Sequence, residues 1–262
     1  MQETDPKIIK TKSMKKTIIA LVLVSMIWST NYAQENTGDQ GTTSSKDSLS
    51  FSLNADIVSR YLWRGLLLSG NPNIQPYASL SYKGLTFGAW GSYGLSTPYA
   101  EADLYLSLNV GSFNFTVSDY YVHSDDSLEN FSYFKYKRSE TCHSFEGQIT
   151  YYGPESFPIS LTAATFFAGI DDNNDDADVK DQDYSTYFEV AYTATVSDIP
   201  IKMFVGGTPW KGLYAKDANI VNVGINAIKT LKFNKDVEIP VFTTLAVNPA
   251  SEDIFFVVGI TF

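Results

Sequence analysis

The segment from Leu49 to Arg64 restricts the fold most, because apolar and polar side chains alternate along it. Its apolar positions recur at every second residue and end in an aromatic pair, Tyr61 and Trp63, whereas the positions between them carry mainly Ser, Asn, Asp and Arg. Successive side chains of a β-strand point to opposite faces, so the segment predicts a strand with one apolar and one polar face. The same pattern returns along nearly the whole chain, which is typical of transmembrane β-barrels that are apolar towards lipid and polar towards the lumen.

About twelve segments of this kind follow one another from Leu49 to the end of the chain. The expected strands run over 49–64, 74–82, 85–93, 100–110, 113–122, 143–152, 158–170, 183–197, 201–210, 219–229, 237–247 and 253–262. Short turns alternate with longer connections between them, as when one end of a barrel carries turns and the other carries loops. We therefore predict an all-β fold, a single antiparallel transmembrane β-barrel of the outer-membrane type with about twelve strands.

Composition agrees with a barrel in a membrane. Aromatic residues make up 15% of the chain and charged residues only 18%, and barrels place aromatic rings at both boundaries between lipid and water. No apolar run after the first 33 residues is long enough for a membrane-spanning helix. The formal net charge of -10 argues against binding nucleic acid through its phosphates.

Residues 1–33 predict a cleaved secretory signal peptide. Several Lys residues precede an apolar core from Thr17 to Trp28, which is too short to span a bilayer, and Ala33 supplies a small residue at the cut. Residues 34–48 are polar and rich in Gly, Ser and Thr, so we expect a disordered periplasmic lead. Residues 49–262 then form the barrel, integral to a bacterial outer membrane, with both termini periplasmic and the connections 123–141 and 171–182 outside the cell.

The last strand ends IFFVVGITF, with one apolar face that closes on Phe262. A final strand that ends in Phe resembles the terminal signal by which outer-membrane barrels are recognised for assembly, so we expect Phe262 to be that assembly signal. The expected partners are therefore the barrel assembly machinery, outer-membrane lipid and lipopolysaccharide, and small solutes, with no nucleic acid.

Several short motifs in the first half of the mature chain resemble one family. They are SRYLWRG at 59–65, Gln75-Pro76, GAWGS at 88–92, EADLY at 101–105 and DYY at 119–121. Together they resemble an uncharacterised, porin-like family of bacterial outer-membrane β-barrel proteins that is named for a Gly-Cys-Trp motif. The middle Cys of that motif is Ala89 here. The resemblance implies a barrel of this kind without an established activity or substrate.

Assigning faces by parity places a set of polar side chains and one Trp in the lumen. They are Asp56, Arg60, Arg64, Trp90, Glu101, Asp103, Glu146, Glu189 and Lys202. One interpretation is a structural network in which opposite charges pair inside the barrel. The other is a charged constriction, since rings of charge select ions by sign in pores. Arg60 and Arg64 are expected on the polar face of the first strand, where Asp103 or Glu146 from other strands would meet them.

Two strands depart from the simple pattern. The segment 158–170 is apolar on both faces, and Asp119 shares the outward parity of Phe113 and Phe115. A β-bulge or a misplaced register would account for Asp119.

The sequence offers little for a metal or a catalytic site. Asp171 and Asp175 belong to a D-x-N-x-D pattern like that of a calcium loop, but the Gly and Glu that such a loop needs later are missing. We therefore predict a solvated loop without a metal site; weak divalent-cation binding, bridging to lipopolysaccharide phosphates, is the alternative. No cofactor motif is present, and the lone Cys142 cannot form an internal disulfide.

The chain has two His, and each adjoins a Ser: His123 with Ser124 and His143 with Ser144. Adjacent residues of a strand point to opposite faces, so neither pair forms a nucleophile and base, and we predict no enzyme. We expect a porin-like channel or transporter for small solutes. A structural or surface-interaction barrel with a closed lumen is the alternative, and a lipid-modifying enzyme ranks below both. Eight strands fill with side chains and sixteen leave a water channel, so about twelve strands leave both of the first two open.

Overall fold

The computed structural model describes residues 48–124, 132–138, 140–171, 182–233 and 237–262. The expected signal peptide, all of the expected lead except Ser48, and the candidate metal ligand Asp175 lie outside these residues. In the part of the chain that is described, no helix is long and apolar enough to cross a membrane.

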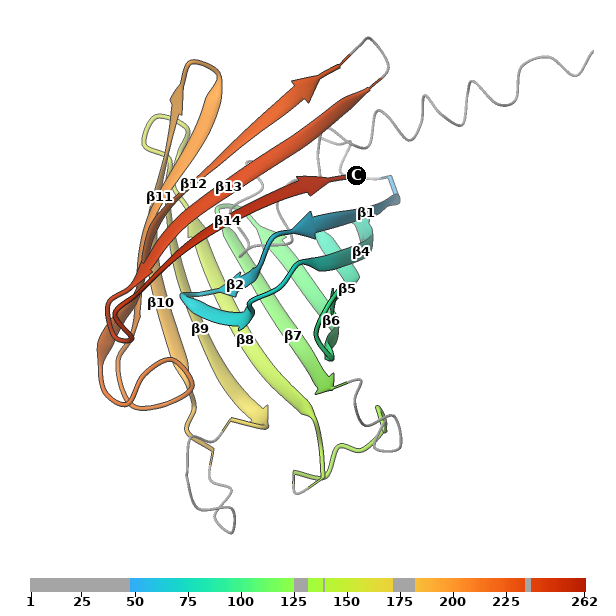
Figure 1. The fold of residues 1–262 in the computed structure, drawn as a ribbon. Helices are drawn as coiled ribbons and strands as arrows, with labels where there is room; N and C mark the ends of the chain where they lie inside the picture. The colour runs from blue at the N-terminus through green and yellow to red at the C-terminus, as the bar shows by residue number, and fades with distance from the viewer. Residues whose placement is uncertain (1–47, 125–131, 139, 172–181, 234–236) are drawn as a thin grey trace, which may run out of the picture.

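Twelve strands of the described residues form one closed antiparallel barrel (Figure 1). They are β1 (Ser50–Val58), β4 (Asn73–Tyr82), β5 (Leu85–Gly94), β6 (Tyr99–Val110), β7 (Phe113–Ser124), β8 (His143–Tyr152), β9 (Ile159–Gly169), β10 (Thr186–Val196), β11 (Ile199–Thr208), β12 (Asn219–Lys232), β13 (Glu238–Asn248) and β14 (Asp253–Thr261). Each of these strands pairs with the next one in this order, so that β1 pairs with β4, and β14 closes the barrel on β1. The predicted all-β antiparallel barrel is confirmed.

Turn geometry determines which end of the barrel each connection occupies. Lys83-Gly84 and Ser197-Asp198 have positive φ at both positions, which matches two-residue hairpin turns that follow the twist of the strands. These turns lie at the end of the barrel where the chain also terminates, and the longer connections lie at the opposite end (Figure 1). The backbone of Phe262 exchanges hydrogen bonds with that of Ala55 in β1, so the last residue completes the closure of the barrel.

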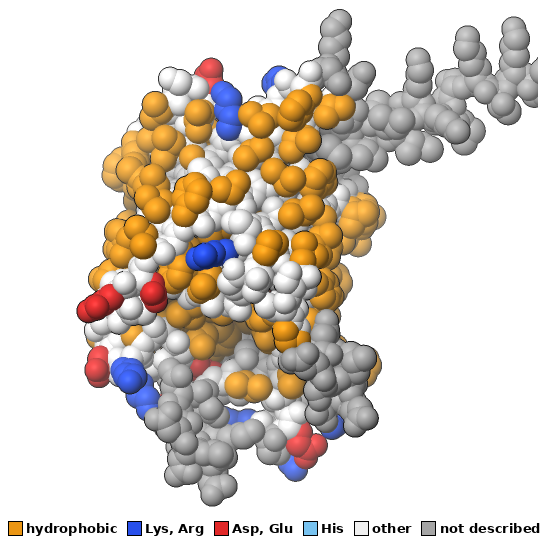
Figure 2. All heavy atoms as spheres, in the orientation of Figure 1, with side chains coloured by type: hydrophobic (Ala, Val, Ile, Leu, Met, Phe, Trp, Pro, Cys, Tyr) orange, Lys and Arg blue, Asp and Glu red, His pale blue; other side chains and the backbone are white. Residues whose placement is uncertain are grey.

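The two faces of the wall differ as the alternation predicts. On β14, Ile254 is 67% exposed and Phe256 is 60% exposed, whereas Phe255 and Val257, which alternate with them, are buried. Large apolar side chains are exposed in the same alternating way on the other strands. Figure 2 shows one face of the molecule, where hydrophobic side chains cover much of the wall and acidic side chains lie towards its ends. The outside is therefore an apolar belt.

One expected strand is wrong in its extent. The barrel strand β1 ends at Val58, and the next residues form a separate two-stranded hairpin, β2 (Tyr61–Trp63) and β3 (Leu66–Ser69). The predicted strand 49–64 is thus two elements, and the predicted connection 65–73 contains a strand. A left-handed backbone at Arg64 (φ 47°) and Gly65 (φ 79°) turns the chain back here, which period-two alternation alone does not reveal. We call Tyr61–Ser69 the lumen hairpin.

The structure explains both departures from the simple pattern. Phe166 of β9 is buried on the inner face and packs against Trp63 of the lumen hairpin, so β9 is apolar inside as well as outside. Asp119 pairs in register with Phe145, and Tyr121 pairs with His143, so Asp119 does face outward and no bulge reverses it. Its carboxylate lies 2.6 Å from Nδ1 of His143, which gives the outward acid a partner.

Candidate functional site in the barrel lumen

The lumen hairpin leaves the wall just after β1, where the backbone N–H of Ser59 makes a last hydrogen bond to the carbonyl of Val258 in β14. Its tip reaches β12 and β13, which lie three and two strands from β1 around the barrel. A Cβ atom on Gly65 would come within 1.9 Å of the carbonyl oxygen of Val221 in β12, and the side-chain amide of Asn248 in β13 donates to the Gly65 carbonyl at 3.0 Å. Only glycine fits at this tip, because a side chain would clash with β12 and because the positive φ of residue 65 favours glycine.

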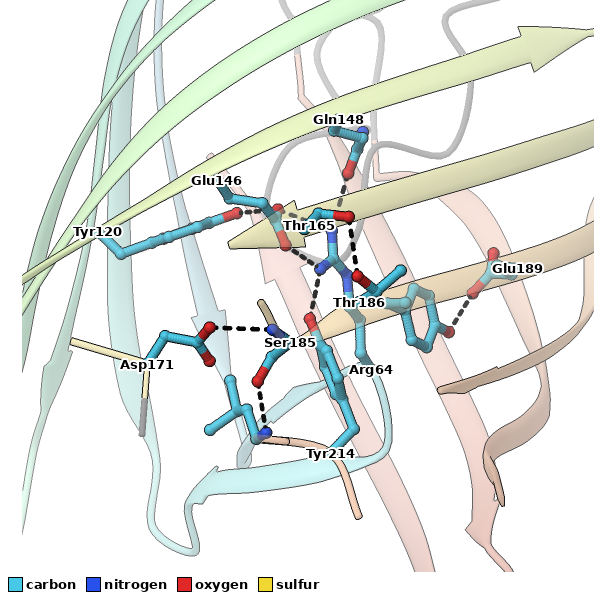
Figure 3. A network of polar contacts seen from close by, with 12 residues as sticks. Arg64, Tyr120, Glu146, Gln148, Thr165, Asp171, Ser185, Thr186, Glu189 and Tyr214 are labelled. Atoms are coloured by element: carbon cyan, nitrogen blue, oxygen red, sulfur yellow. Dashed lines mark hydrogen bonds and ion pairs between the residues drawn. The ribbon is translucent and has the colours of Figure 1, made fainter. Parts of the chain in front are cut away.

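Arg64, beside that glycine, forms the central contact of the site (Figure 3). Its guanidinium donates to both carboxylate oxygens of Glu146 in β8, at 2.5 and 3.1 Å. It also donates to the hydroxyl of Tyr214 at 2.6 Å and to the side-chain carbonyl of Gln148 at 2.8 Å. The side chains of Arg64 and Glu146 are 3% and 1% exposed. A bidentate, buried pair of this kind is both strong and geometrically specific.

Aromatic rings surround this ion pair. The centroid of Trp63 lies 5.8 Å from that of Tyr120 and 5.7 Å from that of Tyr214, and the guanidinium carbon of Arg64 is 4.6 Å from the centre of the Trp63 ring. Tyr120 also donates its hydroxyl to Glu146 at 3.0 Å. The rings exclude water, which strengthens the charged hydrogen bonds that they enclose.

A second apolar contact fixes the base of the lumen hairpin. Leu62 is 4% exposed and belongs to a buried cluster of inward side chains from β1, β10, β11, β13 and β14. The cluster consists of Val58, Leu62, Ala191, Phe204, Phe242, Ala246, Phe255 and Val257. A lumen filled with water would carry polar residues at such positions, so these side chains show that the hairpin closes part of the lumen.

Other lumen charges lie on two separate parts of the wall. Lys202 of β11 pairs with Glu189 of β10 at 2.8 Å, and Tyr187 donates its hydroxyl to the same carboxylate. Across the barrel, β6 carries Glu101 and Asp103, both buried. Glu101 accepts from the Tyr99 hydroxyl at 2.6 Å, and Asp103 accepts from the backbone N–H of Tyr121 at 3.2 Å.

Asp56 and Trp90 also face the lumen. Asp56 is buried on β1, and Trp90 lies opposite Asp103 in the β5–β6 register, with its ring 5.4 Å from that of Tyr61. Arg60 differs from expectation. It is exposed in the break between β1 and β2, and among the described residues no ion pair involves it. The reason is that β1 ends at Val58, so Arg60 does not belong to the polar face of a wall strand.

Sequence reasoning missed two parts of the site. Tyr214 comes from the connection between β11 and β12 and folds into the lumen, where the backbone N–H of Leu213 donates to the hydroxyl of Ser185 at 2.7 Å. An aromatic residue in a connection is a weak signal, and nothing in the pattern indicates which way the connection folds. The lumen hairpin itself has a stronger signal, the Arg64-Gly65 turn between apolar residues.

A cluster on the outer face was also missed. His143 is fully buried there, between the Asp119 carboxylate and the backbone carbonyl of Tyr133. Burial and the nearby Asp119 raise the pKa of Tyr133 to about 12. Ser144, beside His143, faces the other way and donates its hydroxyl to the backbone carbonyl of Ile170. The cluster therefore holds the segment after residue 131 against the wall, and the adjacent Ser is not placed next to the imidazole.

The metal candidate Asp171 has a structural role. Its carboxylate accepts from the Ser185 backbone N–H and from the side-chain amide of Gln182, each at 2.9 Å. Within the described residues, no group of three or more His, Cys, Asp or Glu side chains is arranged to hold a metal ion.

No protein-family model matches the chain, and no curated protein sequence matches it closely enough to indicate common descent.

Proposed function

We propose that the protein is an integral β-barrel of a bacterial outer membrane that lets small solutes through, and that the lumen hairpin closes this path in the structure described above. The apolar belt supports insertion in lipid, because only a closed barrel or a helix satisfies its backbone there. Secretion through the signal at 1–33, assembly through Phe262 and contact with lipopolysaccharide belong to the same proposal. Membership of the outer-membrane family that is named for a Gly-Cys-Trp motif is part of the proposal as well.

The observation that carries a solute path is the type of contact at the tip of the lumen hairpin. The tip is held by a buried ion pair between Arg64 and Glu146 and by hydrogen bonds to Tyr214 and Gln148. If the hairpin filled the barrel permanently, apolar side chains at its tip would stabilise the fold as well as an ion pair does, because a buried ion pair contributes little net stability. A polar contact, in contrast, can exchange its partners for water when the hairpin moves. We therefore interpret the tip as a latch.

The alternative is a barrel that stays closed and has a structural or surface-interaction role. The packing of Leu62 and Trp63 in the lumen favours it, since apolar contacts are lost when the hairpin moves. Catalysis is not part of either proposal.

Conductance in planar lipid bilayers separates the two. The wild type is compared with a variant in which residues 60–70 are replaced by a Gly-Ser linker and with Arg64→Gln/Glu146→Gln, which releases the latch. The matched control is Glu189→Gln/Lys202→Gln, which removes a second buried ion pair whose two residues belong to β10 and β11 and not to the lumen hairpin. We expect conductance from the first two variants and the closed behaviour of the wild type from the control. Folded but non-conducting linker and latch variants would leave the closed barrel as the better account.

A further inference from the structure

A short part of the connection between β7 and β8 carries a local excess of positive charge. Lys135, Lys137 and Arg138 fall within four successive residues, and no acidic residue occurs from 132 to 138. We call residues 133–138 the basic segment. The chain as a whole has a formal net charge of -10, so this cluster runs against the composition. A cationic surface of this kind attracts an anionic ligand.

Contacts with the cluster around His143 anchor the basic segment to the outer face of the wall. The backbone carbonyl of Tyr133 lies 2.5 Å from Nε2 of His143, and the Tyr133 hydroxyl donates to the Asp119 carboxylate at 3.4 Å. The rings of Tyr136 and His143 are 4.7 Å apart between their centroids. Lys135 therefore lies between two anchored tyrosines, which fix the position of its backbone on the outer face.

The basic segment begins where the apolar belt ends. Along the outer face of β7, Phe115 and Val117 are exposed, and the next outward residue is Asp119, which the Tyr133 hydroxyl contacts. Two residues of a strand span about 6.6 Å, so the segment adjoins the exposed apolar wall. It lies at the end of the barrel that carries the longer connections (Figure 1). With the belt in lipid, the basic segment is at the level of the lipid headgroups.

Exposed aromatic rings accompany the cations. Phe134 is 84% exposed and Tyr136 is also exposed, and the two rings alternate with Lys135 and Lys137 along the chain. Aromatic side chains concentrate at the boundary between lipid and water, and the stem of a Lys covers apolar surface while its ammonium group reaches the headgroups. The basic segment therefore presents apolar and positive surface together, which is complementary to an anionic lipid.

The two Lys side chains of the basic segment are available to an anion. Within the described residues, no ion pair involves Lys135. Lys137 pairs with Glu140 at 3.1 Å, but both side chains are exposed, and an exposed pair contributes little free energy, so a phosphate group can replace the carboxylate. The Cα atoms of Lys135 and Lys137 are at most about 7 Å apart. Because Lys side chains are flexible and bind phosphate as point charges, both can reach one phosphate group.

We propose that the basic segment binds the phosphate groups of lipopolysaccharide through Lys135 and Lys137. Phe134 and Tyr136 then lie among the lipid headgroups. Lipopolysaccharide fits because it is the strongly anionic glycolipid of the outer leaflet, and the proposed topology places this connection on that side of the membrane. The inference rests on the proposed location in an outer membrane and identifies the surface that contacts this lipid. It does not depend on a solute path, because the basic segment lies outside the lumen.

The test is the equilibrium binding of lipid A, the phosphorylated anchor of lipopolysaccharide, to the full-length protein folded in detergent, measured by microscale thermophoresis. Diphosphoryl lipid A is compared with monophosphoryl lipid A of the same acyl chains and with phosphatidylglycerol. We expect diphosphoryl lipid A to bind most tightly, with an affinity that falls as salt is added. Lys135→Gln/Lys137→Gln should weaken this binding at least about tenfold, since one cationic side chain near an anionic lipid surface contributes about fivefold in affinity.

The matched control is Lys229→Gln/Lys232→Gln, which removes the same charge at the opposite end of the barrel. Lys232 also has an acidic partner, Glu238, and this double variant should bind diphosphoryl lipid A as the wild type does. Asp119→Ala separates an anchored site from general attraction of charge. It makes the protein less acidic but removes an anchor of the basic segment, so binding should weaken. Faster migration in unheated detergent gels verifies that each variant is folded.

Equal binding of the two forms of lipid A, an equal loss of affinity in both double variants, or tighter binding by Asp119→Ala overturns the inference. Failure of the solute path gives a different result. Linker and latch variants that fold without conducting, while diphosphoryl lipid A still binds most tightly, contradict the solute path and leave the lipid site in place. If these variants conduct while the number of phosphate groups does not affect binding, the solute path stands and only the lipid site is wrong.

Discussion

Removing Arg64 alone should be far more damaging than removing Arg64 and Glu146 together. In Arg64→Met the carboxylate of Glu146 stays buried and keeps the hydrogen bond from the Tyr120 hydroxyl, whereas Tyr214 and Gln148 lose their contact with the guanidinium. Breaking a buried ion pair in this way costs about 3–5 kcal/mol. In Arg64→Met/Glu146→Gln no charge is left unpaired, so the double variant should recover most of that loss.

Urea unfolding in phospholipid vesicles, followed by tryptophan fluorescence, measures these free energies. The double-mutant cycle should give a coupling energy of about 2–3 kcal/mol. The matched control is the pair Lys232 and Glu238, whose side chains are 71% and 33% exposed; the same substitutions there should cost about 0–1 kcal/mol. If the lumen hairpin of Arg64→Met moves away, water reaches the carboxylate of Glu146. The loss of unfolding free energy is then limited to the free energy of releasing the hairpin, and the variant should conduct. An Arg64→Met variant that is as stable as the wild type and closed would refute the latch.

Three further predictions follow from the same contacts. Trp63→Ala removes the ring that packs on Tyr120 and Tyr214 and should cost about 3–5 kcal/mol in the same unfolding assay; a loss below about 1 kcal/mol would place Trp63 outside the lumen. Deleting Phe262 removes its backbone closure with Ala55, so the folded fraction that migrates faster in unheated detergent gels should fall, and a normal folded fraction would show that assembly does not read this residue. An epitope inserted after Asn174, in a long connection, should be labelled on intact cells; labelling only after the outer membrane is breached would invert the topology.

The barrel could be predicted from the sequence because its signal is local and repeated. Alternation along a strand depends only on the two environments on either side of the wall, and the turns at Lys83-Gly84 and Ser197-Asp198 are encoded by the residues that form them. The extent of the first strand could not be predicted in this way. Tyr61 and Trp63 continue the apolar positions of β1, although residues 61–63 pair with Leu66–Ser69 and lie inside the barrel.

The interior of the lumen was only partly predictable for a different reason. Parity places Glu146 and Glu189 on the inner face, but it does not say which cation each one meets, since the partners are 82 residues apart in one pair and on adjacent strands in the other. Apolar residues at inward positions of β9 and β14 are a further signal, which assigning faces by parity does not use. Phe166 and Phe255 face inward because hairpin residues cover them, so strands that are apolar on both faces indicate an inserted segment.

The most direct test of the closed lumen is the accessibility of a single cysteine on the hairpin. In a Cys142→Ser background, Leu62→Cys is compared with Phe134→Cys, because Leu62 is buried among inward side chains and Phe134 is 84% exposed on a connection. Both variants are treated in vesicles with a large polyethylene-glycol maleimide and analysed by their shift in denaturing gels. The closed lumen predicts rapid labelling of Phe134→Cys and labelling of Leu62→Cys only after unfolding. Equal labelling rates in the folded protein would show that the hairpin lies outside the lumen.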